Sequence, residues 1–157
     1  MAHAITPPCD RKEADFFDRG AALMRSAGFK LTPQRSAILD LFCEHGDHLT
    51  PQEVFRRLEK TVASLSLATV YNSLEVFEQV GIVTKFCAEH GQTYYDPNPT
   101  PHHHAVCERC EEIYDLELSE STMEQLVGVV QNAAAIKMSF RIQETKIWFR
   151  GVCDRCQ

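Results

Sequence analysis

Apolar residues recur every three or four positions in four segments of the first half of the chain, a spacing that predicts four amphipathic helices. We expect the first helix over residues 14–27 and the fourth to end near Gly81. Thr32, Thr50 and Ser66 precede the last three helices and supply the side-chain oxygen that an N-cap requires. The predicted core positions are Phe17, Ala21, Met24, Ile38, Leu41, Phe42, Val54, Phe55, Leu58, Leu67, Val70, Tyr71, Leu74 and Phe77.

Two short runs rich in β-branched and aromatic residues follow these helices, over 82–86 and 93–96, with Gly91 in the turn between them. Compact helices followed by a hairpin are typical of a winged helix-turn-helix. We therefore predict a winged-helix DNA-binding domain over residues 14–96, preceded by an N-terminal tail over 1–13.

Prolines at alternate positions of 97–101 are incompatible with a helix, so this segment is the predicted linker. Residues 102–157 alternate β-rich runs (102–107, 113–118 and 137–149) with one helix that Ser119 opens, and the predicted inward positions of that helix are Met123, Leu126, Val127 and Val130. The fold class is mixed α/β (α+β), with a small α+β domain after the winged helix. Because such a thin layer leaves a sheet edge and a helix face uncovered, we expect this second domain to form a homodimer.

The formal charge of −6 argues against a uniformly basic nucleic-acid binder, but the imbalance is local. Residues 1–86 carry 10 Lys and Arg against 11 Asp and Glu, whereas residues 87–157 carry 6 against 11. If DNA is bound, the near-neutral first half should bind it. With no apolar run long enough for a membrane span and no apolar secretory segment, we expect a soluble, cytoplasmic protein with no membrane partner.

Two C-x-x-C pairs lie in the last third of the chain, and they are Cys107–Cys110 and Cys153–Cys156. Four thiolates brought together in this way suit a structural zinc ion, and the alternatives are buried free thiols or two disulfides. Cys9, Cys43 and Cys87 have no partner spacing, so we interpret them as ordinary core or surface residues.

A histidine triplet suggests a second metal site. His102 and His104 are two apart on a predicted strand and share a face, whereas His103 points away. Further donors are Asp96, Asp115 and His48. This nitrogen and oxygen set suits ferrous iron or manganese better than zinc. Spacing alone does not decide whether these residues bind a metal, since a single histidine such as His48 is more often a surface or capping residue.

Several motifs together resemble the ferric uptake regulator superfamily over about residues 18–156. They are Leu31-Thr32-Pro33-Gln34-Arg35, Ala68-Thr69-Val70-Tyr71-Asn72-Ser73-Leu74, the run H-H-H-A-V-C-E-R-C and the closing C-D-R-C. The resemblance implies a dimeric repressor with one structural Zn²⁺ and one regulatory Fe²⁺ or Mn²⁺ per subunit. It assigns zinc to the four knuckle cysteines, and the regulatory ion to His48, Asp96, His102, His104 and Asp115.

Within the superfamily the chain is most similar to the peroxide-sensing branch. Asn72 stands where iron-sensing members usually have Arg, and Asp96 and Asp115 stand where those members usually have Glu. The resemblance implies that ferrous iron reacts with hydrogen peroxide and that His48 or His102 is oxidised. Glu111 departs from the glycine that the family commonly has after the first knuckle.

The fourth helix is the predicted recognition helix, which in a dimer would contact successive half-sites of a palindromic operator. Its outward residues are Ala68, Thr69, Asn72 and Ser73, whose small and amide side chains can approach base edges. Tyr71 lies on the apolar stripe, so periodicity leaves a core role open, and the resemblance favours DNA contact. Lys30, Arg35 and Arg57 are candidate backbone or minor-groove contacts, and the resemblance gives Lys30 the minor groove.

Three other functions compete with a peroxide sensor. The first is an iron, zinc or manganese homeostasis repressor of the same superfamily. The second is a mononuclear non-haem iron enzyme, but no substrate pocket or cofactor motif is visible and five ligands leave little room for a substrate, so we expect no enzyme. The third is a zinc-stapled interaction module, which leaves the helix-turn-helix unexplained.

Overall fold

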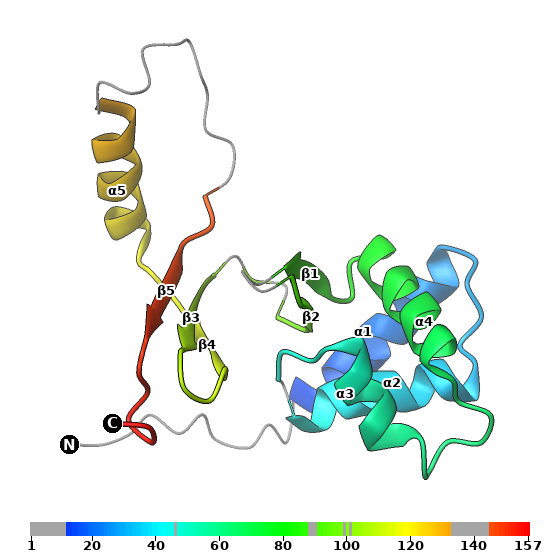
Figure 1. Ribbon diagram of the computed structural model, residues 1–157. Coiled ribbons are helices and arrows are strands. Elements are labelled where there is room, and N and C mark those ends of the chain that lie inside the picture. The colour runs from blue at the N-terminus through cyan, green and yellow to red at the C-terminus, as the bar shows by residue number, and fades with distance from the viewer. Residues whose placement is uncertain (1–11, 46, 88–90, 99, 101, 133–144) are drawn as a thin grey trace. The chain divides into compact units, whose positions relative to one another are not determined.

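The computed structural model describes residues 12–45, 47–87, 91–98, 100, 102–132 and 145–157 (Figure 1). The chain divides into two compact units, Met1–Pro99 and Thr100–Gln157. The first unit carries four helices and a hairpin, and the second carries a three-stranded sheet and one helix, so the predicted α+β class is confirmed. Cys9 and most of the predicted N-terminal tail lie outside the described residues. None of the described helices is long and apolar enough to cross a membrane.

The four predicted helices of the first unit are confirmed: α1 (Lys12–Ser26), α2 (Pro33–His45), α3 (Pro51–Leu58) and α4 (Leu67–Gln79). Their N-terminal signals act as expected. Thr50 forms a full capping box with Glu53, and Ser66 Oγ accepts a hydrogen bond from the Thr69 backbone N–H at 3.1 Å. Gly28 follows α1 with φ of +79°, a left-handed conformation that ends a helix readily when no Cβ is present.

A single core joins these helices. Its fully buried side chains include Met24, Ile38, Leu39, Phe42, Val54, Val70, Leu74 and Phe77. Two α4 positions differ from the prediction: Leu67, expected in the core, is 36% exposed, and Ser73, expected on the outer face, is only 2% exposed. Tyr71, for which helical spacing left a core role open, is also 36% exposed. The buried stripe follows Val70, Ser73, Leu74 and Phe77, and Tyr71 lies about 100° around the helix from Val70, outside that stripe.

The hairpin consists of β1 (Thr84–Cys87) and β2 (Thr93–Asp96), paired antiparallel with Thr84 opposite Asp96. Its first strand begins two residues later than predicted. Ile82 and Val83 are buried in the helical core instead, and the Ile82 N–H donates to Phe77 O to close the end of α4. A two-way backbone bridge between Leu49 and Tyr95 joins β2 to the segment before α3.

The second unit has a sheet of order β4-β3-β5. Its strands are β3 (His103–Cys107), β4 (Ile113–Leu116) and β5 (Trp148–Gly151), with β4 antiparallel and β5 parallel to β3. Helix α5 (Glu120–Asn132) begins after Ser119, whose Oγ accepts from the Thr122 N–H at 3.2 Å. Most of the predicted strand over 137–149 lies outside the described residues.

Part of the apolar face of α5 is exposed in the described part of the chain, although Met123 and Val127, also predicted to face inward, are half-buried. Leu126 and Val130, both predicted to face inward, are 39% and 50% exposed, and Val129 is 70% exposed. Sequence periodicity identified the apolar positions, but it does not say whether the covering surface belongs to the same chain. Exposed valines and leucines on one helix are what the expected homodimer would bury.

Candidate functional site

The four knuckle cysteines form one cluster within the second unit. Cys107 ends β3 and pairs with Gly151 of β5, so the parallel strands deliver both C-x-x-C turns to the same end of the sheet. The four Sγ atoms all lie within 4.8 Å of one another. A zinc–sulfur bond of about 2.3 Å sets tetrahedral sulfurs about 3.8 Å apart, and Cys110 Sγ lies 3.7 Å from Cys153 Sγ. The expected clustering of the four cysteines is confirmed, and the spacing of their sulfur atoms suits zinc.

Hydrogen bonds prepare two of these cysteines to act as thiolates. The backbone N–H of Cys153 donates to Cys107 Sγ at 3.4 Å, and this donor, followed by the backbone of Cys110, lowers the pKa of Cys107 to about 6. A hydrogen bond from the Tyr114 hydroxyl lowers the pKa of Cys153. The pKa of Cys156 is raised to about 12, first by its side-chain hydrogen bond with Cys153. A divalent cation would displace that proton, since zinc binds the thiolate form.

The first unit contributes a histidine and a carboxylate. The Leu49–Tyr95 bridge sets the preceding His48 beside the following Asp96, and His48 Nε2 lies 3.8 Å from Asp96 Oδ1. Asp96 is 1% exposed and accepts hydrogen bonds from the Asn98 N–H at 2.7 Å and from Thr84 Oγ1 at 3.4 Å. A buried carboxylate held in this way is ordered enough to serve as a metal ligand.

The second unit contributes two histidines and a carboxylate. His104 of β3 lies directly opposite Asp115 of β4 in the strand register. Asp115 Oδ1 is 3.4 Å from His102 Nε2 and 3.9 Å from His104 Nε2, and the two Nε2 atoms are 2.9 Å apart. His102 Nδ1 is 2.6 Å from Thr100 O, a contact that makes Nδ1 the protonated nitrogen and leaves the Nε2 lone pair for an ion.

These donors fit a hard divalent metal. All five expected regulatory ligands carry nitrogen or oxygen, and within each unit their donor atoms converge. Ferrous iron and manganese favour this mixture over the all-sulfur set of the zinc cluster. The described residues therefore offer two chemically distinct sets of possible metal ligands, four thiols in the second unit and histidines with aspartates in each unit.

His103 faces away from these donors, as strand alternation predicts. It is 8% exposed, and its Nε2 lies 3.0 Å from Met123 Sδ of α5. Burial, and then the neighbouring His102 and His104, lower its pKa. A neutral imidazole packed on a thioether joins β3 to α5 and is part of the framework of the second unit.

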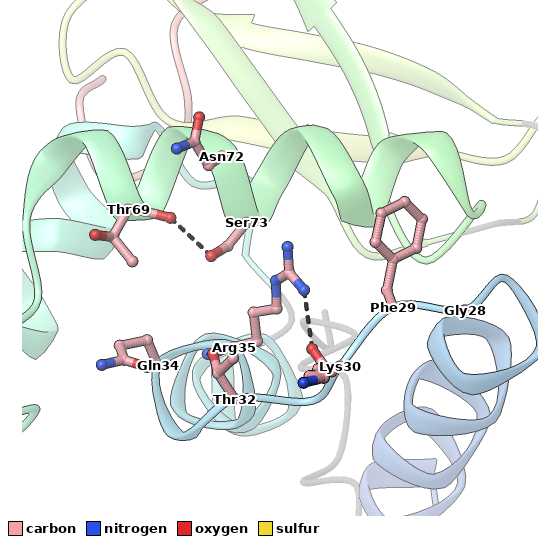
Figure 2. Close-up of a pocket in the computed structure, with 9 residues that line it drawn as sticks. All are labelled: Gly28, Phe29, Lys30, Thr32, Gln34, Arg35, Thr69, Asn72 and Ser73. Atoms are coloured by element: carbon pink, nitrogen blue, oxygen red, sulfur yellow. Dashed lines mark hydrogen bonds between the residues drawn. The ribbon is translucent and has the colours of Figure 1, made fainter.

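A hollow of about 490 Å³ lies on the first unit between the start of α2 and the middle of α4 (Figure 2). Its lining residues are Gly28, Phe29, Lys30, Thr32, Gln34, Arg35, Thr69, Asn72 and Ser73. Arg35 extends from α2 toward α4, where its Nη1 donates to Lys30 O at 2.8 Å and its guanidinium lies over the Phe29 ring. Five of the predicted DNA-contact residues therefore share one concave surface with a fixed positive charge.

Ser73 has a different place from the one expected. Its Oγ donates to the Thr69 carbonyl oxygen at 2.7 Å and it forms the buried floor of the hollow (Figure 2). Ala68 and Asn72 are exposed on α4 as predicted. Arg57 lies outside the hollow lining and pairs with Asp47 at 3.6 Å.

Tyr71 is on the surface, so the core alternative is wrong. Its hydroxyl accepts a hydrogen bond from Gln52 Nε2 of α3 at 3.1 Å. This acceptance leaves the hydroxyl hydrogen free to donate to a phosphate or base acceptor. The sequence interpretation missed Gln52, which carries no signal beyond its place in the first turn of a helix.

A protein-family model described as the ferric uptake regulator family matches residues 26–156. The chain is 30% identical over 140 residues to the peroxide-responsive repressor PerR of Staphylococcus aureus, covering 89% of this chain and 90% of that protein. It is similar to the solved ferric uptake regulator of Francisella tularensis with iron, at 27% identity and a TM-score of 0.68, over 82% of this chain and 95% of that one. It is also similar to the solved PerR of Streptococcus pyogenes, at 25% identity and a TM-score of 0.50, over 90% and 92% of the two chains.

Proposed function

The chain belongs to the ferric uptake regulator family, whose members are metal-dependent DNA-binding transcriptional regulators and not enzymes. From this membership we propose that the protein is a homodimeric repressor, which senses hydrogen peroxide through ferrous iron bound at the histidine–aspartate site. The observation that carries it is the Asp115 carboxylate 3.4 Å from His102 Nε2, with the second acidic ligand, Asp96, also an aspartate. The peroxide-responsive relative supports the same choice.

One ion would take all five donors of the histidine–aspartate site. His48 and Asp96 come from the DNA-binding unit, whereas His102, His104 and Asp115 come from the dimerisation unit. An ion with ligands in both units would hold them in one arrangement, and loss of the ion would free the proline-rich linker. We propose that this coupling selects the dimer shape that binds DNA.

Ferrous iron held by these five residues would supply the redox chemistry by which one oxygen atom of hydrogen peroxide is added to an imidazole and the other leaves as water. His48 and His102 are the residues proposed to be oxidised. An oxidised imidazole loses the lone pair that it offers to a metal, so ligand oxidation would dismantle the site and release the operator.

DNA contact is proposed for the hollow and the adjacent surface of α4. The proposed contact residues are Lys30, Arg35, Arg57, Ala68, Thr69, Tyr71, Asn72 and Ser73. Ser73 would act only from the floor of the hollow because it is buried. In a two-fold dimer the paired α4 helices would enter successive major grooves of a palindromic operator, about 34 Å apart.

Anaerobic protein loaded with ferrous iron tests the proposal. We expect tight operator binding that is lost after stoichiometric peroxide, with a gain of about 16 Da, the mass of one oxygen atom, on peptides that contain His48 or His102. The same protein loaded with manganese is the control and should keep its operator. Asp115→Glu should reduce the response to peroxide while DNA binding persists. Release without a mass gain on either peptide would refute histidine oxidation as the trigger.

An iron-homeostasis repressor is the second candidate, because the chain is 27% identical to the iron-bound ferric uptake regulator of Francisella tularensis. This function predicts DNA binding that follows the concentration of free ferrous iron and ignores peroxide. Titrating operator binding with iron, manganese and zinc, each with and without peroxide, separates the two functions in one experiment.

A further inference from the structure

The two C-x-x-C turns each carry an arginine as their third residue. The side chain of each arginine contacts residues in or next to the other C-x-x-C turn. Arg109 Nη1 of the first turn donates to the backbone carbonyl of Cys156. Arg155 Nη2 of the second turn forms an ion pair with Glu112 and donates to the Tyr114 hydroxyl at 3.4 Å. The four-cysteine cluster is therefore bordered by two crossed guanidinium groups.

Glu112 sits in an unfavourable place for a zinc site. Its Oε2 lies 3.9 Å from Cys110 Sγ and 3.2 Å from the hydroxyl oxygen of Tyr114. Four thiolates on one Zn²⁺ carry a formal net charge of −2, and a carboxylate at van der Waals distance from one of them adds a further negative charge. Like charges this close destabilise the metal-bound tetrathiolate.

We propose that Arg155 is the charge-compensating residue of the zinc site, and that zinc affinity depends on its ion pair with Glu112. The guanidinium neutralises the carboxylate beside Cys110 and brings a positive charge to the edge of the tetrathiolate. Arg155 acts through Glu112 and is a positioning residue, since it contacts no metal-ligating sulfur in the described contacts. This inference rests on zinc binding by the four cysteines.

The side chains concerned allow a clean test. Arg155 is 68% exposed and Glu112 is 42% exposed, so neither substitution empties a buried site. Arg150 provides a matched control in the same unit, because its Nε lies 3.8 Å from a different carboxylate, that of Glu108.

The experiment measures zinc affinity of the full-length protein by competition with a chromophoric chelator, after metal analysis has established one zinc per chain. We expect Arg155→Gln to weaken zinc binding about tenfold, as loss of an outer-sphere partner does. Arg155→Lys should stay within about threefold of the wild type, and Arg150→Gln should leave the affinity unchanged. The double variant Arg155→Gln/Glu112→Gln should recover most of the affinity, because the uncompensated carboxylate is gone.

Three results would overturn the proposal. They are an unchanged affinity in Arg155→Gln, an equal loss in Arg150→Gln, and a double variant as weak as the single one. Wild-type protein that binds no zinc would instead refute the four-cysteine zinc site itself, so the two failures are distinguishable.

Discussion

Replacement of Glu111 by glycine should strengthen the folded zinc knuckle. Glu111 follows Cys110 with φ of 59°, in the left-handed region where a side chain crowds the following carbonyl. Its backbone N–H donates to Cys107 O at 2.9 Å, a bond that glycine keeps. Within the described contacts its side chain makes no hydrogen bond or ion pair, so Glu111→Gly removes nothing favourable.

The magnitude follows from two opposing terms. A residue with a Cβ has about 1–2 kcal/mol of conformational strain in the left-handed region, and replacement by glycine removes this strain. Glycine then loses roughly 0.5–1 kcal/mol more backbone entropy on folding. The net gain is about 0–1.5 kcal/mol, and its midpoint of about 0.75 kcal/mol corresponds to roughly a three- to fourfold increase in zinc affinity where knuckle folding and zinc binding are linked.

Chelator competition is the better assay, since a two-unit chain need not unfold in one step. Urea unfolding of the zinc-loaded dimer, at one fixed protein concentration, gives the second measurement. Glu117→Gly is the control: Glu117 is exposed in the same unit, and among the described residues other than glycine only Ser64 and Glu111 have positive φ. The free energy of unfolding of the Glu117→Gly variant should fall by about 0.5–1 kcal/mol. Equal zinc affinities for Glu111→Gly and the wild type, or equal shifts in both variants, would refute the reasoning.

Four further outcomes are expected. Tyr71→Phe should weaken operator binding about tenfold by fluorescence anisotropy, because a hydroxyl that donates to a charged phosphate contributes about 1.5 kcal/mol; a change below twofold would contradict this. Gln52→Leu should cost affinity in the wild type but nothing more in the Tyr71→Phe background. Val130→Asp should shift the dimer to monomer in sedimentation velocity, since it puts a charge on an apolar face, and an unchanged dimer would place the interface elsewhere. Zinc removal should unfold the second unit while circular dichroism retains the helices of the first.

Two errors in the sequence interpretation, at Leu67 and Ile82, have one physical origin. Leu67 shares the helical spacing of Val70 and Leu74, yet it is exposed, because periodicity gives the angle around a helix and not the width of the surface that covers it. Ile82 is β-branched and suits a strand, but the helical core buries it before β1 begins. Tertiary packing overrode local preference at each of these positions.

At the candidate sites, too, some features follow from local sequence and others depend on tertiary packing. The C-x-x-C spacing was enough to predict a four-cysteine cluster, and strand alternation was enough to separate His103 from His102 and His104. The pairing of His48 with Asp96 had no local signal, since it depends on the backbone bridge between Leu49 and Tyr95, 46 residues apart in the chain.

The sequence by itself determined the helices, their caps, the metal-ligand types and the family, because each is encoded within a few consecutive residues or one short motif. Only the tertiary structure decided the partners of Tyr71, the crossed arginines of the zinc knuckles and the left-handed backbone at Glu111. Those features depend on where distant segments meet or on what a turn must do to close. Residue type alone does not predict these features, since glutamine, arginine and glutamate are ordinary surface residues until the fold places a partner beside them.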